Sequence, residues 1–335
     1  MGSGSVVAIA AESDLPPVHS RNIWHDGPLC GHRQQIIHAA TIGSLAARVF
    51  QCAADGRVAA VFRQSFYVDI AGSWICIVRY GVGNGPINVV LKNTPGHVWP
   101  LEIKVGNDVQ VSRSELLVGE GFTVHTGLAR RWSPPPVPAS SLADLARGLN
   151  ALAAAVQGRI PRRGLGSFLT GSWPSSGAPL EALKARASVR ALCGWLWSGS
   201  GSDLEVPMAV STLVGLGPGL TPSGDDFLGG ALIALARLRR EDLASRLYWQ
   251  IQPDLPSRTG AISRAHLSAA AAGEGLEALH AALDAVLTGA SGSIGQRLSE
   301  IDRIGHCSGW DALAGAVTVL RSAPRIWSRS EATVA

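Results

Sequence analysis

The spacing of apolar residues changes near the middle of the chain. Between residues 56 and 125, short runs of Val, Ile, Phe, Tyr and Trp are bounded by Gly, Asn and Pro, a pattern typical of strands. The residues before this region, Gln34–Cys52, have a mixed period and are expected to open with a short helix. We predict a small antiparallel sheet or barrel, with strands at Arg57–Arg63, Ser65–Ile70, Ser73–Tyr80, Pro86–Lys92, Leu101–Val105, Asp108–Val111 and Phe122–His125.

After residue 139, apolar residues recur at intervals of three and four, which predicts helices. Ser141 precedes the first of them and Asp144 follows three residues later, so this pair can cap the helix. Strands and helices are segregated along the chain. The predicted fold class is therefore α+β, with an N-terminal antiparallel β-rich domain followed by a mostly helical C-terminal domain. The predicted helices are Leu142–Gln157, Leu180–Trp197, Asp225–Arg239, Asp242–Trp249, Thr259–Ala272, Leu276–Leu287, Ile294–Asp302 and a last long helix that begins near Ser308.

These patterns divide the chain into five parts. We predict a flexible N-terminus at residues 1–30, the β-rich domain at 31–132, the helical domain at 140–325 and a tail at 326–335. Residues 133–139 contain four prolines and are expected to form a stiff linker, because proline forbids regular pairing and stiffens a connection. Residues 253–260 are expected to form a turn between helices.

The composition narrows the classes of partner. Apolar residues make up 46% of the chain and charged residues only 16%, which indicates that part of the surface is buried against other protein subunits. The net charge is +4, and the basic residues are scattered. Scattered basic residues argue against a nucleic-acid partner, whereas a modest positive charge suits a small anionic substrate.

Cysteine usage and hydropathy indicate a cytoplasmic protein. The five cysteines include no C-x-x-C pair, which argues for reduced thiols and against a structural zinc site. No apolar stretch reaches the roughly 18 residues that a membrane-spanning helix requires, so no membrane association is expected.

The richest motif lies at Leu213–Leu238, where alternate glycines run into Thr-Pro-Ser-Gly-Asp-Asp ahead of a helix. Free backbone N–H groups and the positive end of a helix dipole gather at such an N-terminus and favour anions. The adjacent Asp225 and Asp226 are candidate catalytic groups, and they could instead hold Mg²⁺, which prefers oxygen ligands. The candidate anion contacts are Gly217, Gly219, Thr221, Ser223 and Gly224.

Part of this motif is repeated near the C-terminus. The pattern S-G-x-D-x-L-x-G-A occurs from Ser223 and again from Ser308, 85 positions apart. Ser308, Gly309 and Asp311 therefore match residues of the first motif. Our hypothesis is that the two helix N-termini converge on one polar pocket.

Three further segments carry weaker candidates. Thr259 and Ser263 flank the start of a helix rich in small residues, where they act either as caps or as ligand contacts. His306 precedes the second motif and is a candidate general acid or base, with a structural role as the alternative. The loop Arg159–Pro179, which includes Arg163, is a second-tier candidate because long loops often bind ligands.

The segments GLGPGLTPSGDDFLGG, Thr259–Gly273 and GHCSGWDALAG resemble the AllH family, which is associated with a subunit of bacterial oxamate carbamoyltransferase. The resemblance covers roughly residues 205–320, and the N-terminal half matches only in outline. It implies transfer of a carbamoyl group between oxalurate and phosphate, giving oxamate and carbamoyl phosphate, in purine and allantoin catabolism. It also implies partner subunits. The cofactor is unknown, with Mg²⁺ as the candidate.

Two other functions fit the same residues. The chain could be a non-catalytic ligand-binding or scaffolding subunit of a complex. It could also be a hydrolase or phosphotransferase that depends on a metal held by Asp225 and Asp226. The motif lacks the Gly-Lys-Ser/Thr of a nucleotide-binding P-loop, and it does not lie in a βαβ unit.

Overall fold

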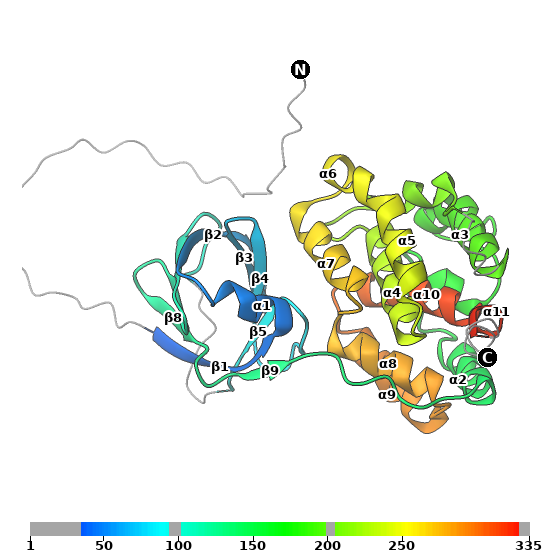
Figure 1. Cartoon of the computed structure of the whole chain (residues 1–335), viewed down its shortest axis with the longest axis horizontal. Coiled ribbons are helices and arrows are strands. Elements are labelled where there is room, and N and C mark those ends of the chain that lie inside the picture. The colour runs from blue at the N-terminus through cyan, green and yellow to red at the C-terminus, as the bar shows by residue number, and fades with distance from the viewer. Residues whose placement is uncertain (1–34, 94–101, 199–204, 328–335) are drawn as a thin grey trace, which may run out of the picture. The chain divides into compact units, whose positions relative to one another are not determined.

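The structure is a computed structural model that describes residues 35–93, 102–198 and 205–327. The predicted flexible N-terminus at residues 1–30 lies outside this range, as does the predicted tail from residue 328 onward. Within the described range the N-terminal half is β-rich and the C-terminal half is helical, as predicted (Figure 1).

The strands of the described residues form one sheet in the order β5-β4-β3-β2-β6-β7-β8-β1-β9. An additional pairing between β5 and β1 closes eight of them into a barrel, and β9 continues along β1 beyond the end of β8. The strands are β1 (Gln35–Gly43), β2 (Ala54–Val61), β3 (Ser65–Ile70), β4 (Ser73–Val78), β5 (Asn88–Leu91), β6 (Asp108–Val111), β7 (Glu115–Val118), β8 (Phe122–His125) and β9 (Arg130–Trp132).

The prediction of an antiparallel sheet holds for most neighbours but not for all, because β1 runs parallel to β8 and β9, and β4 runs parallel to β5. The expected opening helix of Gln34–Cys52 is also wrong. This segment begins as strand β1, and only Ser44–Val49 is helical (α1). Ile37, Ala39 and Ile42 of β1 lie in the barrel core. Alternation along a strand shows which side chains face inward, but it does not show which strands are neighbours.

Alternate residues of the strands fill the barrel. Phe66 and Val68 of β3 pack inside it with Ile75 and Ile77 of β4. The outward residues of β4 are buried as well, since Cys76 and Val78 form a separate cluster on the outer face. A strand that is buried on both faces must be covered from outside. Here the cover includes α7 (Ala261–Ala271), which packs against β4.

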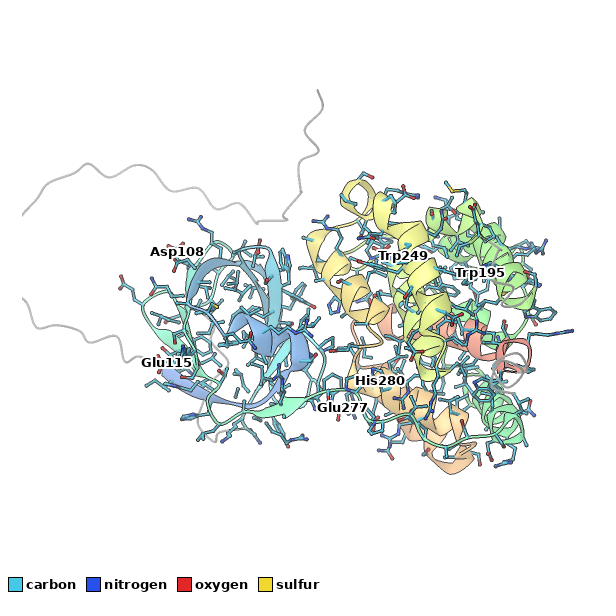
Figure 2. All side chains as sticks on the ribbon, in the orientation of Figure 1. Asp108, Glu115, Trp195, Trp249, Glu277 and His280 are labelled. Atoms are coloured by element: carbon cyan, nitrogen blue, oxygen red, sulfur yellow. The ribbon has the colours of Figure 1, made fainter. Side chains whose placement is uncertain are left out.

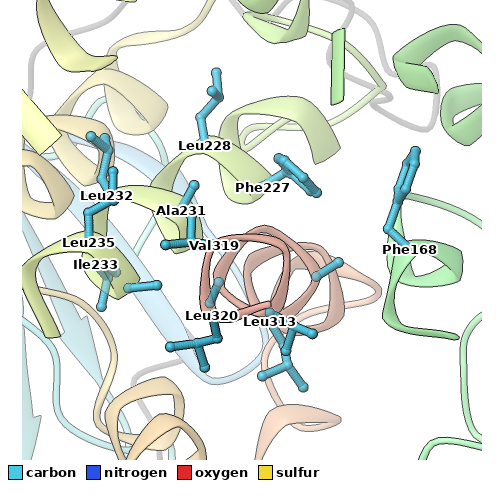
Figure 3. Packing of buried hydrophobic residues seen from close by; sticks show 14 of the residues in the cluster. Phe168, Phe227, Leu228, Ala231, Leu232, Ile233, Leu235, Leu313, Val319 and Leu320 are labelled. Atoms are coloured by element: carbon cyan, nitrogen blue, oxygen red, sulfur yellow. The ribbon is translucent and has the colours of Figure 1, made fainter. Parts of the chain in front are cut away.

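The helical half is built around α4 (Ser223–Arg237) and α10 (Ser308–Leu320), which share the most extensive contact between any two elements (Figure 3). Small residues let the two backbones approach closely. A Cβ added at Gly230 would overlap the carbonyl oxygen of Ala312. The remaining helices are α2 (Leu142–Ala155), α3 (Leu180–Ser198), α5 (Glu241–Ile251), α6 (Leu255–Arg258), α8 (Glu277–Leu287), α9 (Ser291–Ile301) and α11 (Ala323–Trp327).

Local differences from the predicted elements are few. Residues 253–260, expected as a turn, include α6, and the described residues 102–105 are not a strand. Strands β7 and β9, of four and three residues, were not predicted. Ser141 and Asp144 do form the predicted capping box.

The Pro-rich segment at residues 133–139, between the barrel and the helical half, is hydrogen-bonded to the helices. The buried guanidinium of Arg237 donates to the carbonyl oxygen of Pro135 at 2.7 Å and pairs with Asp284. Elsewhere, Glu277 at the start of α8, which is labelled in Figure 2, accepts a hydrogen bond of 2.7 Å from the side-chain amide of Asn84. Among the described residues, no helix is long and apolar enough to cross a bilayer.

Candidate functional site

A cavity of about 610 Å³ connects the outer face of the barrel with the N-termini of α4 and α10. Its walls come from strands β3 to β5, the Gly-rich loop before α4, helix α7 and the segment that leads into α10. Both halves of the chain therefore contribute to one site.

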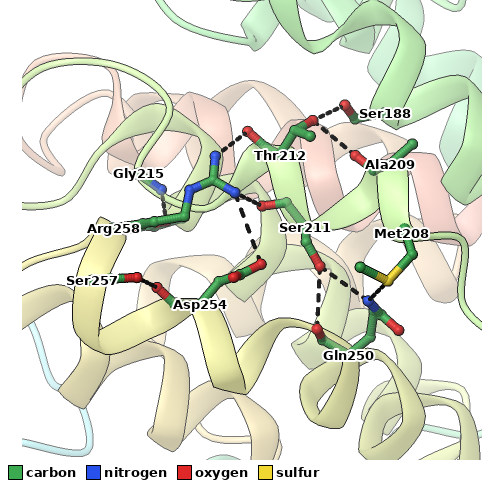
Figure 4. Close-up of polar contacts among 11 residues, drawn as sticks. Ser188, Met208, Ala209, Ser211, Thr212, Gly215, Gln250, Asp254, Ser257 and Arg258 are labelled. Atoms are coloured by element: carbon green, nitrogen blue, oxygen red, sulfur yellow. Dashed lines mark hydrogen bonds and ion pairs between the residues drawn. The ribbon is translucent and has the colours of Figure 1, made fainter.

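The Gly-rich loop depends on backbone conformations that favour glycine. Gly215, Gly217 and Gly219 have φ angles of +72°, +109° and +105°. Arg258 of α6 fastens the preceding turn, because its guanidinium donates to the carbonyl oxygens of Ser211 at 2.8 Å and Thr212 at 3.4 Å (Figure 4). The loop is thus held rigidly ahead of α4.

Asp225 joins this loop to two helices. One carboxylate oxygen accepts from the backbone N–H of Gly215 at 2.8 Å. The other accepts from the hydroxyls of Thr259 and of Ser263, the latter at 2.6 Å. Both oxygens of this buried carboxylate are therefore occupied by protein donors. The side chain thus organises the site by accepting three hydrogen bonds from the protein.

Asp226, unlike Asp225, has a carboxyl oxygen without a hydrogen-bond partner among the described residues. This atom, Oδ2, is buried, and Asp226 lines the cavity. Burial raises the pKa of Asp226 well above its ordinary value, and the negative charges of Asp311 and Asp225 act in the same direction. The hydroxyls of Ser308 and Thr221 oppose this shift without cancelling it. The shift favours the protonated form of this carboxyl.

Asp311, the equivalent residue of the second motif, lies behind the cavity wall and is fully buried. Its Oδ1 atom accepts from the backbone N–H of Leu165 at 2.6 Å, and its Oδ2 atom has no partner among the described residues. Burial raises the pKa of Asp311 to about 6. At neutral pH, Asp311 is thus mostly ionised.

The two repeated motifs meet at the cavity, since the Thr221 and Ser308 hydroxyls lie 3.1 Å apart. Ser223 and Cys307 are also neighbours, with 3.9 Å between oxygen and sulfur. Burial raises the pKa of the Cys307 thiol to about 11, so it is a weak hydrogen-bonding group and not a thiolate nucleophile at neutral pH. Ser223 lies inside α4 and does not cap it, because Pro222 occupies the cap position.

Two loops contribute arginine side chains to the cavity lining. Arg163 lines it immediately before Gly164, which packs against Asp311. Arg303 and His306 line it from the segment that leads into α10. Neither arginine has an ion-pair partner among the residues that the structure describes. His306 is exposed and has a φ of +42°, an uncommon value for a residue with a side chain.

Other predicted residues support the site from outside the cavity. Gly224 packs its backbone against Leu213, and Gly217 lies against Ser223. Thr259 contacts Asp225 and does not line the cavity. The lining does include Gly219, Ser263 and Gly309.

Sequence reasoning missed the side of the cavity that the barrel and α7 provide. Tyr67, Cys76 and His266 line it, and the Tyr67 hydroxyl lies 3.4 Å from Nε2 of His266. Strand alternation places Tyr67 on the outer face of the barrel, but the sequence carries no signal for what covers that face.

The described residues include no group of three or more His, Cys, Asp or Glu side chains arranged to hold a metal ion. Of the two aspartates in the predicted Mg²⁺ site, Asp225 accepts hydrogen bonds from protein donors on both oxygens, and only Oδ2 of Asp226 lacks a partner among the described residues. Mg²⁺ can bind through a single carboxylate together with substrate oxygens, so Asp226 is the residue that would hold it.

Comparison with protein families gives two matches. The family model described as oxamate carbamoyltransferase subunit AllH matches residues 213–320. The model described as the AllH family N-terminal domain matches residues 37–131. No curated protein and no solved structure matches the chain. The two models together cover more than half of the sequence, including the barrel and both repeated motifs.

Proposed function

The chain belongs to the AllH family, and on that premise we propose that it binds the small anionic substrate of an oxamate carbamoyltransferase at the converging N-termini of α4 and α10. The observation that carries this proposal is the buried Oδ2 atom of Asp226, which lacks a partner among the described residues and lies in the cavity wall. A buried polar atom without a partner is costly, and a ligand that bonds to it removes that cost.

The surroundings of Asp226 suit a negatively charged ligand. The Thr221 and Ser308 hydroxyls lie at two helix N-termini, where the dipoles favour anions. The raised pKa of Asp226 favours its protonated carboxyl, which can donate a hydrogen bond as an ionised carboxylate cannot. Arg163 and Arg303 add positive charge on the same cavity.

The reaction implied by the family is the exchange of a carbamoyl group between oxalurate and phosphate. A phosphate oxygen forms a bond to the carbamoyl carbon, and the bond from that carbon to the oxamate nitrogen breaks. The departing nitrogen takes up a proton, so the products are carbamoyl phosphate and oxamate. In this proposal Asp226 supplies the proton, and hydroxyl donors stabilise the oxygen on which negative charge develops.

Partner subunits belong to the proposal as well. Several large apolar side chains of the helical half are exposed, among them Met208 at 75% and Trp249 at 69%. Figure 2 labels Trp249 on α5. Such residues are common at protein interfaces, in agreement with a chain that works as one subunit of an enzyme. Activity within the purine and allantoin pathway stays a prediction from the family.

The test is turnover of oxalurate and phosphate by the native complex that contains either the wild-type chain or Asp226→Asn. Asparagine keeps the size and the neutral charge but cannot give up a proton, so we expect kcat to fall about a hundredfold. Asp254→Asn is the control, because Asp254 is partly exposed and outside the cavity. An unchanged kcat in Asp226→Asn would remove Asp226 from the reaction.

A further inference from the structure

A row of uncharged polar side chains crosses the outer face of the barrel. In the strand register Tyr67 of β3 lies opposite Cys76 of β4, and Cys76 lies opposite Asn88 of β5. All three line the cavity. Their immediate neighbours, including Phe66 and Ile77, point the other way into the barrel core. The row therefore faces the helical half, from which helix α7 brings His266.

Each of these groups is electrically neutral near neutral pH. Burial lowers the pKa of His266 to about 4, so its ring has one N–H donor and one acceptor nitrogen. Burial also raises the pKa of Tyr67 and brings that of Cys76 to about 12. The Tyr67 hydroxyl lies 3.4 Å from Nε2 of His266, and the two rings meet edge to face at 6.3 Å.

The arginines of the cavity are distributed unequally. Its arginines, Arg163 and Arg303, come from segments next to Asp311 and to the start of α10. No lysine or arginine comes from the lining residues of the barrel or of α7. An anionic group placed against the barrel would lose its hydration without gaining a cation, which is unfavourable. A neutral amide needs only donors and acceptors, and the row supplies both.

We propose that Tyr67 and His266, with Cys76 and Asn88 beside them, form the subsite that binds the uncharged amide end of the substrate, while the helix N-termini bind its anionic end. The barrel would then determine specificity for an amide or carbamoyl compound over a simple anion. This inference rests on the proposed function, because it assumes that an anionic amide occupies the cavity.

The proposed amide subsite predicts different effects on the binding of oxamate and of inorganic phosphate. Oxamate carries an amide and a carboxylate, whereas inorganic phosphate carries no amide. Tyr67→Phe removes one hydroxyl and retains the ring, so in calorimetric titrations of the native complex it should weaken oxamate binding about tenfold and leave phosphate binding within about twofold. Tyr80→Phe is the matched control, because Tyr80 is an exposed tyrosine that does not line the cavity.

A second variant, His266→Leu, removes both ring nitrogens and should weaken oxamate binding in the same selective way. Wild-type protein that binds neither ligand would overturn the proposed function itself. A different result would overturn the amide subsite alone. In that case the wild-type protein binds both ligands, but Tyr67→Phe and His266→Leu either weaken oxamate and phosphate binding equally or weaken neither. Thermal unfolding of each variant shows whether the fold is intact, and either folded variant decides the question.

Discussion

Gly230 of α4 and Gly315 of α10 occupy equivalent positions in the two repeated motifs, and each faces a carbonyl oxygen of the other helix. A Cβ at Gly230 would overlap the oxygen of Ala312, and a Cβ at Gly315 would overlap the oxygen of Phe227. Ala312 and Phe227 are themselves equivalent positions, so the two helices meet in a pseudo-twofold arrangement. The repeat in the sequence therefore corresponds to a repeated contact, and this contact places the two helix N-termini at one cavity.

The first prediction concerns this contact. Gly230→Ala and Gly315→Ala should each lower the free energy of unfolding by about 3 kcal/mol, because a backbone carbonyl cannot move aside as a flexible side chain can. Gly229→Ala is the matched control in the same helix, since its Cβ would lie at an ordinary 3.8 Å from Ala270. It should be neutral or stabilising by up to about 1 kcal/mol. Urea unfolding measures all three, and equal effects at Gly229 and Gly230 would contradict the close contact.

The second prediction separates the adjacent aspartates. Asp225→Asn should lower the free energy of unfolding by roughly 2 kcal/mol, because an amide cannot accept from Gly215, Thr259 and Ser263 at once. Asp254→Asn should have almost no effect, since its ion pair with Arg258 is long and partly exposed. Urea unfolding of the two variants measures the difference. A stable Asp225→Asn with lost turnover would instead indicate that Asp225 contacts substrate.

Much of this architecture could be predicted from the sequence. The limits of β3, β6 and β8 agree with prediction at both ends, and Ser141 caps α2 with Asp144 as expected. These features depend on local patterns. The sequence left an open sheet and a barrel as alternatives and did not indicate the parallel partners of β1, because pairing between strands distant in the chain has no local signature.

Some residues of the candidate site could likewise be predicted from the sequence, and others could not. The repeated Ser-Gly-x-Asp pattern is sufficient by itself to indicate Asp226 and Ser308 as candidates. Asp226 occupies the repeated Asp position of this pattern and Asp225 the variable one, but the pattern does not show that the oxygens of Asp225 bond to the protein whereas Oδ2 of Asp226 has no partner among the described residues. Tyr67 and His266 were not predicted as site residues, because a tyrosine in a strand and a histidine in a helix are common. Only the tertiary fold brings them to one cavity.

The third prediction follows from the pKa of Asp311, which is about 6 in the folded protein against an ordinary 3.8. A raised carboxyl pKa means that the folded state holds the proton more tightly, so this contribution to stability is complete below pH 3.8 and is lost as pH rises through 6. Between about pH 5 and pH 8 the loss should be about 1 to 2 kcal/mol. Asp311→Asn cannot ionise and should show a flatter dependence in urea unfolding. Identical dependence in the two proteins would contradict the shift.

The fourth prediction links the two acidic groups during turnover. If Asp226 must be protonated, kcat should fall at high pH as that carboxyl ionises. The negative charge of Asp311 helps to keep the pKa of Asp226 raised. Asp311→Asn removes this charge, so the alkaline decline of kcat should move to lower pH. A decline that stays in place, or that moves to higher pH, would show that Asp311 does not influence the proton donor.

The most direct test of the central claim is calorimetric titration of oxamate into the native complex, with the wild-type chain and with the double variant Thr221→Val and Ser308→Ala. The double variant removes both partners of one hydrogen bond and also the two hydroxyls that bond to Asp226, so thermal unfolding is measured beside the titration to show that the fold is intact. The account predicts one oxamate site per chain in the wild type and an affinity at least tenfold weaker in the double variant. Equal affinity in the two proteins, or no binding of oxamate by the wild-type complex, would contradict a substrate site at the converging N-termini of α4 and α10.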